Sequence, residues 1–120
     1  MKPIAITGLV VVSPSGIDKR AFWANIKAGR SVVKRIDRFD ASKYPSHIAG
    51  QVHELDAYSN VSSRLLKKID LFSHMALVAS ELAIEDARLD LSKENLKRAG
   101  IFMGNAIGGW LYAETELRDL

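Results

Sequence analysis

Runs of apolar residues along the chain predict three strands. Residues 4–12 are apolar and rich in β-branched types, and the turn residues Ser13-Pro14-Ser15-Gly16 close the run. An apolar run of this length bounded by turn residues predicts a buried strand. The same pattern predicts a second buried strand over residues 100–104 and a short strand over residues 48–52, with a loop of mixed charge over residues 30–47.

Helical spacing of apolar residues follows the first strand. Asp18 suits the N-cap of a helix, and Phe22, Trp23 and Ile26 place apolar groups at i, i+1 and i+4. Gly29 suits the end of this helix, because glycine adopts the left-handed backbone conformation that closes many helices.

The most informative helix is predicted over residues 71–87, with Asp70 as its cap and a preceding turn over residues 64–68. Apolar side chains lie on nearly every side of this helix, which indicates burial on more than one face. A domain of this size rarely surrounds a helix completely, so we expect the helix to pack against more protein than these 120 residues supply. Further helices are predicted over residues 92–98 and 110–120, and the alternation of strands and helices predicts an α/β layered fold.

Composition narrows the function classes mainly by exclusion. The chain is 48% hydrophobic and has no apolar run of about 18 residues, so we expect a globular protein with no membrane span. Its start is a poor signal peptide, which favours the cytoplasm. The net charge of +3 suits an acidic partner, but aromatic residues do not interleave with basic ones, so we expect no nucleic-acid binding. The absence of cysteine excludes disulfides, thiolate metal sites and a cysteine nucleophile from this chain.

The spacing of glycines and histidines supports neither a cofactor nor a metal. Residues 104–109 are glycine-rich, but they lack the Gly-Lys-Ser/Thr ending of a phosphate-binding loop and do not fit a dinucleotide-binding fingerprint. His47, His53 and His74 are scattered without a metal-ligand pattern. We expect His47 and His53 to be exposed, and His74 to be a structural residue with its hydrogen bonds satisfied.

Several segments, in matching order and spacing over nearly the whole chain, resemble the β-ketoacyl synthases. One such match would be weak evidence, whereas matches in register along the chain are specific. The matching segments are Ile6 to Gly16, Phe22-Trp23 with Gly29-Arg30-Ser31, Arg38-Phe39-Asp40, Ile48 to Val52, Asp70-Leu71-Phe72, Glu85-Asp86-Ala87 and Gly104 to Gly109.

The resemblance implies a thiolase-like fold of α-β-α-β-α layers, of which residues 1–120 would be the N-terminal portion of the synthase N-terminal domain. It also implies the reaction of a 3-oxoacyl-[acyl-carrier-protein] synthase, in which an acyl thioester condenses with malonyl-carrier protein in fatty-acid or polyketide synthesis. The cysteine, two histidines and lysine of that reaction lie beyond residue 120 in the family pattern. Residues 1–120 alone are therefore expected to be inactive. The expected partners are an acyl carrier protein and a second subunit, in a homodimer or in a heterodimer with a chain-length factor.

Four residues are candidates for binding roles under this resemblance. Arg64, Lys67 and Lys68 share one helical face by their i, i+3, i+4 spacing, and the resemblance implies contact with the acidic carrier protein. An ordinary solvated charged face is the alternative. Ile107 is similar in position to a substrate-binding residue that lines the acyl pocket near the dimer interface and limits chain length; core packing is the alternative.

Val10 and Arg88 stand where glycine is usual in the family pattern. Val10 requires more volume in its strand, which favours a divergent subfamily such as a polyketide-type synthase. Arg88 disfavours a left-handed conformation after the helix of residues 71–87. Two other functions stay open: a non-catalytic chain-length factor, which lacks the cysteine, and an independent small binding domain, which the all-round apolar helix argues against.

Overall fold

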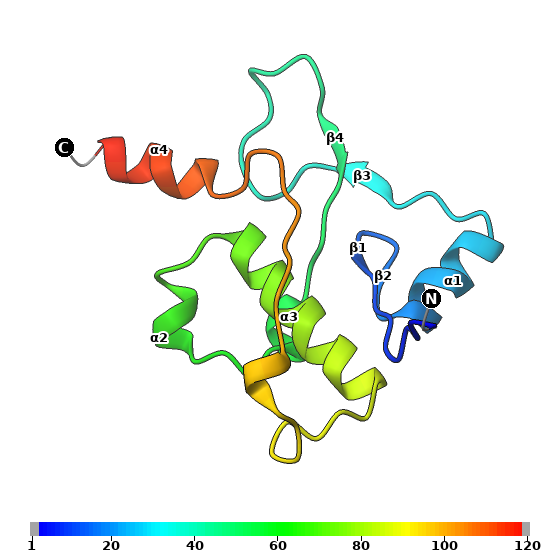
Figure 1. Ribbon diagram of the computed structural model, residues 1–120. Helices are drawn as coiled ribbons and strands as arrows, with labels where there is room; N and C mark the ends of the chain where they lie inside the picture. The colour runs from blue at the N-terminus through cyan, green and yellow to red at the C-terminus, as the bar shows by residue number, and fades with distance from the viewer. Residues whose placement is uncertain (1–2, 119–120) are drawn as a thin grey trace.

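The computed structural model describes residues 3–118, and its central element is the helix α3 (Leu71–Asp86). Figure 1 shows α3 in the middle of the molecule, with α2 on one side and the N-terminal elements on the other. The elements in chain order are β1 (Val12–Ser13), β2 (Gly16–Ile17), α1 (Lys19–Lys27), β3 (Val33–Arg35), β4 (Ile48–Gly50), the short 3-10 helix η1 (Leu55–Tyr58), α2 (Ser63–Leu66), α3, the 3-10 helix η2 (Leu96–Arg98) and α4 (Trp110–Arg118). Over residues 3–118, no helix has both the length and the apolar character needed to cross a membrane.

The strands form two separate antiparallel hairpins. β1 pairs with β2, with Val12 opposite Ile17, and β3 pairs with β4, with Val33 opposite Gly50. The predicted strand over residues 48–52 is confirmed for β4. The predicted loop over residues 30–47 was wrong at β3, where pairing with the distant β4 supplies the hydrogen bonds that make Val33–Arg35 a strand.

The predicted buried strands over residues 4–12 and 100–104 are not formed. Only Val12 of the first run lies in a strand, and the second run has no regular structure. Most of their large apolar side chains face solvent: Ile6 is 85% exposed and Phe102 is 97% exposed. A strand requires neighbours that satisfy its backbone groups and cover its apolar faces, and residues 3–118 supply no strand partner to residues 4–11 or to residues 100–104.

The hydrophobic core is small and lies on one side of α3. It consists of Ile17, Val52, Leu55 and Val78, with Val12, Leu71, Met75 and Leu82 packed against it. The expected burial of α3 on more than one face is not met among the described residues, because only His74 and Val78 of this helix are buried. Its other apolar side chains stay partly open to solvent.

The predicted helix boundaries are confirmed where local residues cap the helix. The Asp18 carboxylate accepts hydrogen bonds from the first-turn amides of α1, and the Asp70 carboxylate accepts one from the Ser73 amide at 2.9 Å. Gly29 follows α1 with φ of 61°, as expected of a glycine that closes a helix. The predicted helix over residues 92–98 is reduced to η2. α4 matches the last predicted helix as far as Arg118, and residues 119–120 of that prediction lie outside the described residues.

Arg88 overturns one expectation, because it does adopt the left-handed conformation, with φ of 52°. The Leu89 amide donates to the Ile84 carbonyl at 3.1 Å, and the Arg88 amide donates to the Glu85 carbonyl at 2.9 Å. This pair of bonds is the Schellman arrangement, which satisfies carbonyls at the end of α3. The bonds hold Arg88 in a conformation that costs a residue with a side chain about 1 kcal/mol.

Replacing Arg88 by glycine is therefore expected to raise the free energy of unfolding of the complete protein by about 1 kcal/mol. Urea unfolding measures the change. Lys27→Gly is the control, because it places glycine at a right-handed helical position in α1 and is expected to lower stability by a similar amount. A loss of stability on Arg88→Gly would contradict the left-handed assignment.

Candidate functional site

The three predicted carrier-binding cations lie at the end of α2 and just beyond it. The Ser62 hydroxyl caps this single-turn helix by accepting from the Leu65 amide at 3.3 Å. Arg64 lies within α2, and Lys67 is the C-cap of this helix. Lys68 follows in a turn, in which its own amide donates to the Leu65 carbonyl at 2.8 Å. α2 thus ends at Leu66, earlier than predicted. Of the three cations expected on one helical face, only Arg64 lies within the helix, and the two lysines lie in the turn that follows it.

All three cations are exposed, and the ion pairs found within residues 3–118 involve none of them. Lys67 also borders a cavity of about 420 Å³, together with Asp56, Asp70 and His74. Two carboxylates therefore line that cavity beside Lys67. We call the three exposed side chains of Arg64, Lys67 and Lys68 the cationic face.

The glycine-rich turn of residues 104–109 connects to the start of α4. The Asn105 side-chain oxygen accepts from the Gly108 amide at 3.2 Å, and Gly109 has φ of 83°. The Gly109 carbonyl then accepts from the Ala113 amide at 3.0 Å, which begins the helix. Ile107, the predicted pocket residue, is 74% exposed on this turn.

The turn lies against the first turn of α3. A Cβ atom at Gly108 would lie 2.6 Å from two ring carbons of Phe72, and one at Gly109 would lie 3.3 Å from the Asp70 carboxylate. Asp70 and Phe72 belong to a family-like segment of the sequence, but nothing in their spacing indicated this contact. The structure thereby places the turn of Ile107 against the start of α3, which follows the cationic residues in the chain.

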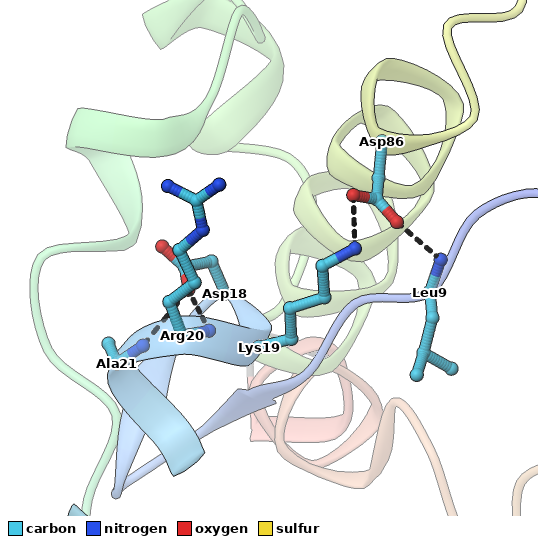
Figure 2. Close-up of polar contacts among 6 residues, drawn as sticks. All are labelled: Leu9, Asp18, Lys19, Arg20, Ala21 and Asp86. Carbon is cyan, nitrogen blue, oxygen red and sulfur yellow. Dashed lines mark hydrogen bonds and ion pairs between the residues drawn. The ribbon is translucent and has the colours of Figure 1, made fainter. Parts of the chain in front are cut away.

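Asp86, in the family-like segment Glu85-Asp86-Ala87, holds the N-terminal apolar run of residues 4–12 against α3. Figure 2 shows the Asp86 carboxylate between two partners: it accepts from the Leu9 amide at 2.9 Å and from the Lys19 ammonium group. The chain approaches α3 so closely at Gly8 that a Cβ there would lie 2.2 Å from the Ala83 carbonyl oxygen. The residue pattern alone showed that Asp86 matches the family, and only the structure shows what it binds.

The same contacts make the stability of the protein depend on pH. The hydrogen bond from Lys19, followed by that from the Leu9 amide, lowers the pKa of Asp86 below its ordinary value of 3.8. A lowered pKa means that the carboxylate stabilises the folded protein above the ordinary value, and that this contribution is lost as pH falls through the folded pKa.

We expect Asp86→Asn to reduce the stability of the complete protein at neutral pH and to change it less at an acidic pH below the lowered folded-state pKa of Asp86, where the wild-type carboxyl group is also uncharged. Urea unfolding at the two pH values measures the difference. Glu94→Gln, at an exposed carboxylate outside the ion pairs found within residues 3–118, is the control and is expected to show little effect at either pH. An Asp86→Asn deficit that is independent of pH would contradict the role of the charge.

The histidines are only partly as expected. His47 and His53 are exposed, as predicted. His74 is buried in α3, with 7% of its surface exposed, but its Nε2 has no hydrogen-bond partner among residues 3–118. Its Nδ1 lies 3.8 Å from the Asp56 carboxylate. The expectation that His74 is fully satisfied was therefore wrong for the described part of the chain.

Comparison with known proteins matches the chain to one family over nearly all its length. The family model described as "Beta-ketoacyl synthase, N-terminal domain" matches residues 1–119. The "Tetracenomycin polyketide synthase ketoacyl synthase beta subunit" of Streptomyces glaucescens is 35% identical over 118 residues, which is 98% of this chain and 29% of that protein. The "3-oxoacyl-[acyl-carrier-protein] synthase 2" of Coxiella burnetii is 38% identical over 111 residues, or 92% of this chain and 27% of that protein.

A third relative, the "Actinorhodin polyketide putative beta-ketoacyl synthase 2" of Streptomyces coelicolor, is 33% identical over 117 residues, 98% of this chain and 29% of that protein. The chain thus spans less than a third of the length of each of these relatives. The model match and the identities agree with the segments noted in the sequence, and the chain belongs to the family of the β-ketoacyl synthase N-terminal domain.

Proposed function

We propose that this chain is the N-terminal part of a condensing enzyme of fatty-acid or polyketide synthesis, a 3-oxoacyl-[acyl-carrier-protein] synthase. The observation that carries the proposal is the family match over residues 1–119, together with relatives named as synthases of this kind. In the complete protein, a malonyl thioester loses carbon dioxide and the resulting enolate carbon attacks an acyl thioester held on a cysteine. A carbon–carbon bond forms, the carbon–sulfur bond breaks, and the cysteine leaves as the thiolate.

The thiolase-like layered fold, with residues 1–120 as the start of its N-terminal domain, is part of this proposal. The exposed apolar runs over residues 4–9 and 101–103 suit strands of a buried sheet, which need partners and cover on both faces. α3 has apolar side chains on more sides than its present neighbours bury, as suits a helix between layers. The core of residues 3–118 is small, which argues against an independent binding domain.

The cationic face supports binding of an acyl carrier protein. Its three cations are exposed and close together in the sequence, and no ion pair within residues 3–118 neutralises them. Exposed cations outside ion pairs attract an acidic partner and raise its association rate. Ile107, on the neighbouring turn, is proposed to line the acyl pocket, and the proposed setting is a cytoplasmic dimer.

A second candidate function is a non-catalytic chain-length factor in a heterodimer. The similarity to a ketosynthase beta subunit, at 35% identity over 98% of this chain, favours it. Val10, in place of the usual glycine, also suits a polyketide-type subfamily. The two candidates differ in the residue at the nucleophile position, which is cysteine in the enzyme.

The deciding experiment supplies the complete protein with an acyl-carrier thioester and malonyl-carrier protein, and follows 3-oxoacyl product by mass spectrometry. The enzyme is expected to form product, and to lose product formation when the cysteine is replaced by alanine, because the acyl group then has no thiol to hold it. Product formed only after a catalytic partner subunit is added would favour the chain-length factor. No condensation either alone or with such a partner would disprove the proposed function.

A further inference from the structure

The contact between Phe72 and Gly108 is the tightest approach to any glycine of the glycine-rich turn. A Cβ at Gly108 would meet three atoms of the Phe72 ring at 2.6 to 2.8 Å, whereas a Cβ at Gly104 would meet nothing within 4 Å. Only a residue without a side chain fits between the turn and the ring. The ring is therefore in direct contact with the main chain of the turn.

Both sides of this contact are held in place. The Asp70 carboxylate fixes the first turn of α3, from which Phe72 projects, by accepting from the Ser73 amide at 2.9 Å. On the other side, the Asn105 side chain accepts from the Gly108 amide at 3.2 Å. Each segment is thus ordered by its own local hydrogen bond, and the side chain at position 72 lies between them, so its size sets how far the turn lies from α3.

Ile107 directly precedes Gly108 and is exposed, so its side chain is not packed on the Phe72 ring. We propose that Phe72 is a positioning residue that sets the location of Ile107, and through it the length of the acyl chain that the synthase accepts. A smaller side chain at position 72 lets the turn settle toward α3 and withdraws Ile107 from the acyl pocket. This inference rests on the proposed function, and it adds a residue that acts on the acyl pocket through the position of Ile107 without lining the pocket itself.

The test compares variants of the complete protein by the ratio of kcat/KM for palmitoyl and hexanoyl carrier thioesters. Phe72→Leu is expected to raise the ratio of long to short substrate by at least about threefold. Ile107→Phe is expected to lower the ratio. Phe39→Leu is the matched control, because the Phe39 ring packs against Tyr44 in a T-shaped pair, and it is expected to leave the ratio unchanged.

A ratio is used because a folding defect lowers the activity with both substrates together and leaves their ratio unchanged. A melting experiment tests the contact itself without activity. Gly108→Ala is expected to lower the melting temperature, and adding Phe72→Leu to that variant to restore part of the loss, since the smaller side chain makes room for the Cβ.

The outcomes separate this inference from the proposed function. If Ile107→Phe shifts the ratio and Phe72→Leu does not, the positioning role of Phe72 is wrong and the condensing enzyme stands. If Phe72→Leu fails to rescue Gly108→Ala, the contact is wrong and the inference falls with it. If the wild-type protein forms no product with either substrate, alone or with a catalytic partner, the proposed function has failed, and the chain-length role of Phe72 fails with it.

Discussion

Replacing Gly8 by alanine is expected to lower the free energy of unfolding of the complete protein by about 3 kcal/mol. The new Cβ would lie 2.2 Å from the Ala83 carbonyl oxygen and 2.9 Å from the Ala87 Cβ. The first of these is a main-chain atom of α3, which cannot rotate away as a side chain can. Relief would require the N-terminal run to move off α3, and this would also break the hydrogen bond from the Leu9 amide to Asp86.

Urea unfolding measures this loss, and the chain offers a matched control. No described atom lies within 4 Å of a Cβ at Gly104, so Gly104→Ala is expected to change the free energy of unfolding by less than about 0.5 kcal/mol. The double variant Gly8→Ala with Ala87→Gly is expected to remain unstable, because the clash with the Ala83 carbonyl persists. Equal stability of Gly8→Ala and the wild type would show that the N-terminal run does not pack on α3 at this point.

Reversing the cationic face is expected to weaken binding of the acyl carrier protein by about 100-fold at low salt. The triple variant Arg64→Glu, Lys67→Glu and Lys68→Glu replaces attraction by repulsion at three exposed positions. The difference from the wild type is expected to shrink as salt rises, because exposed charges are screened. Calorimetric titration with the carrier protein at two salt concentrations measures the effect.

The control carries the same change in net charge on another surface, around η2, at Lys93, Lys97 and Arg98. It is expected to weaken binding far less than reversal of the cationic face. Equal weakening by both triple variants would mean that the affinity for the carrier protein depends only on the net charge of the protein and not on the location of the cations. Unchanged affinity in the first variant would remove the carrier-binding assignment, leaving the cationic face as an ordinary solvated surface.

Features that depend on neighbouring residues could be predicted from the sequence. Asp18 and Asp70 cap helices, and Gly29 closes one, because each acts on backbone groups within a few positions of itself. The segments that identify the family are also local in this sense, and the family match over residues 1–119 agrees with them.

Features that depend on distant partners could not be predicted in this way. Apolar composition alone predicted strands over residues 4–12 and 100–104, but a strand exists only where another strand pairs with it. β3 was missed for the converse reason, since its partner β4 lies beyond a long loop. The left-handed Arg88 was missed because hydrogen bonds at the end of α3 outweigh the backbone preference of its residue type.

For the candidate site, the sequence by itself determined which residues carry charge, bulk or flexibility: the cations at 64, 67 and 68, the bulky Ile107, and the glycines at 108 and 109. Only the tertiary structure decided that Gly108 lies against Phe72 and that Asp86 binds the Leu9 amide. The physical reason is that residue type sets what a side chain can do, while its partner is whatever group the folded chain brings within a few ångströms of it.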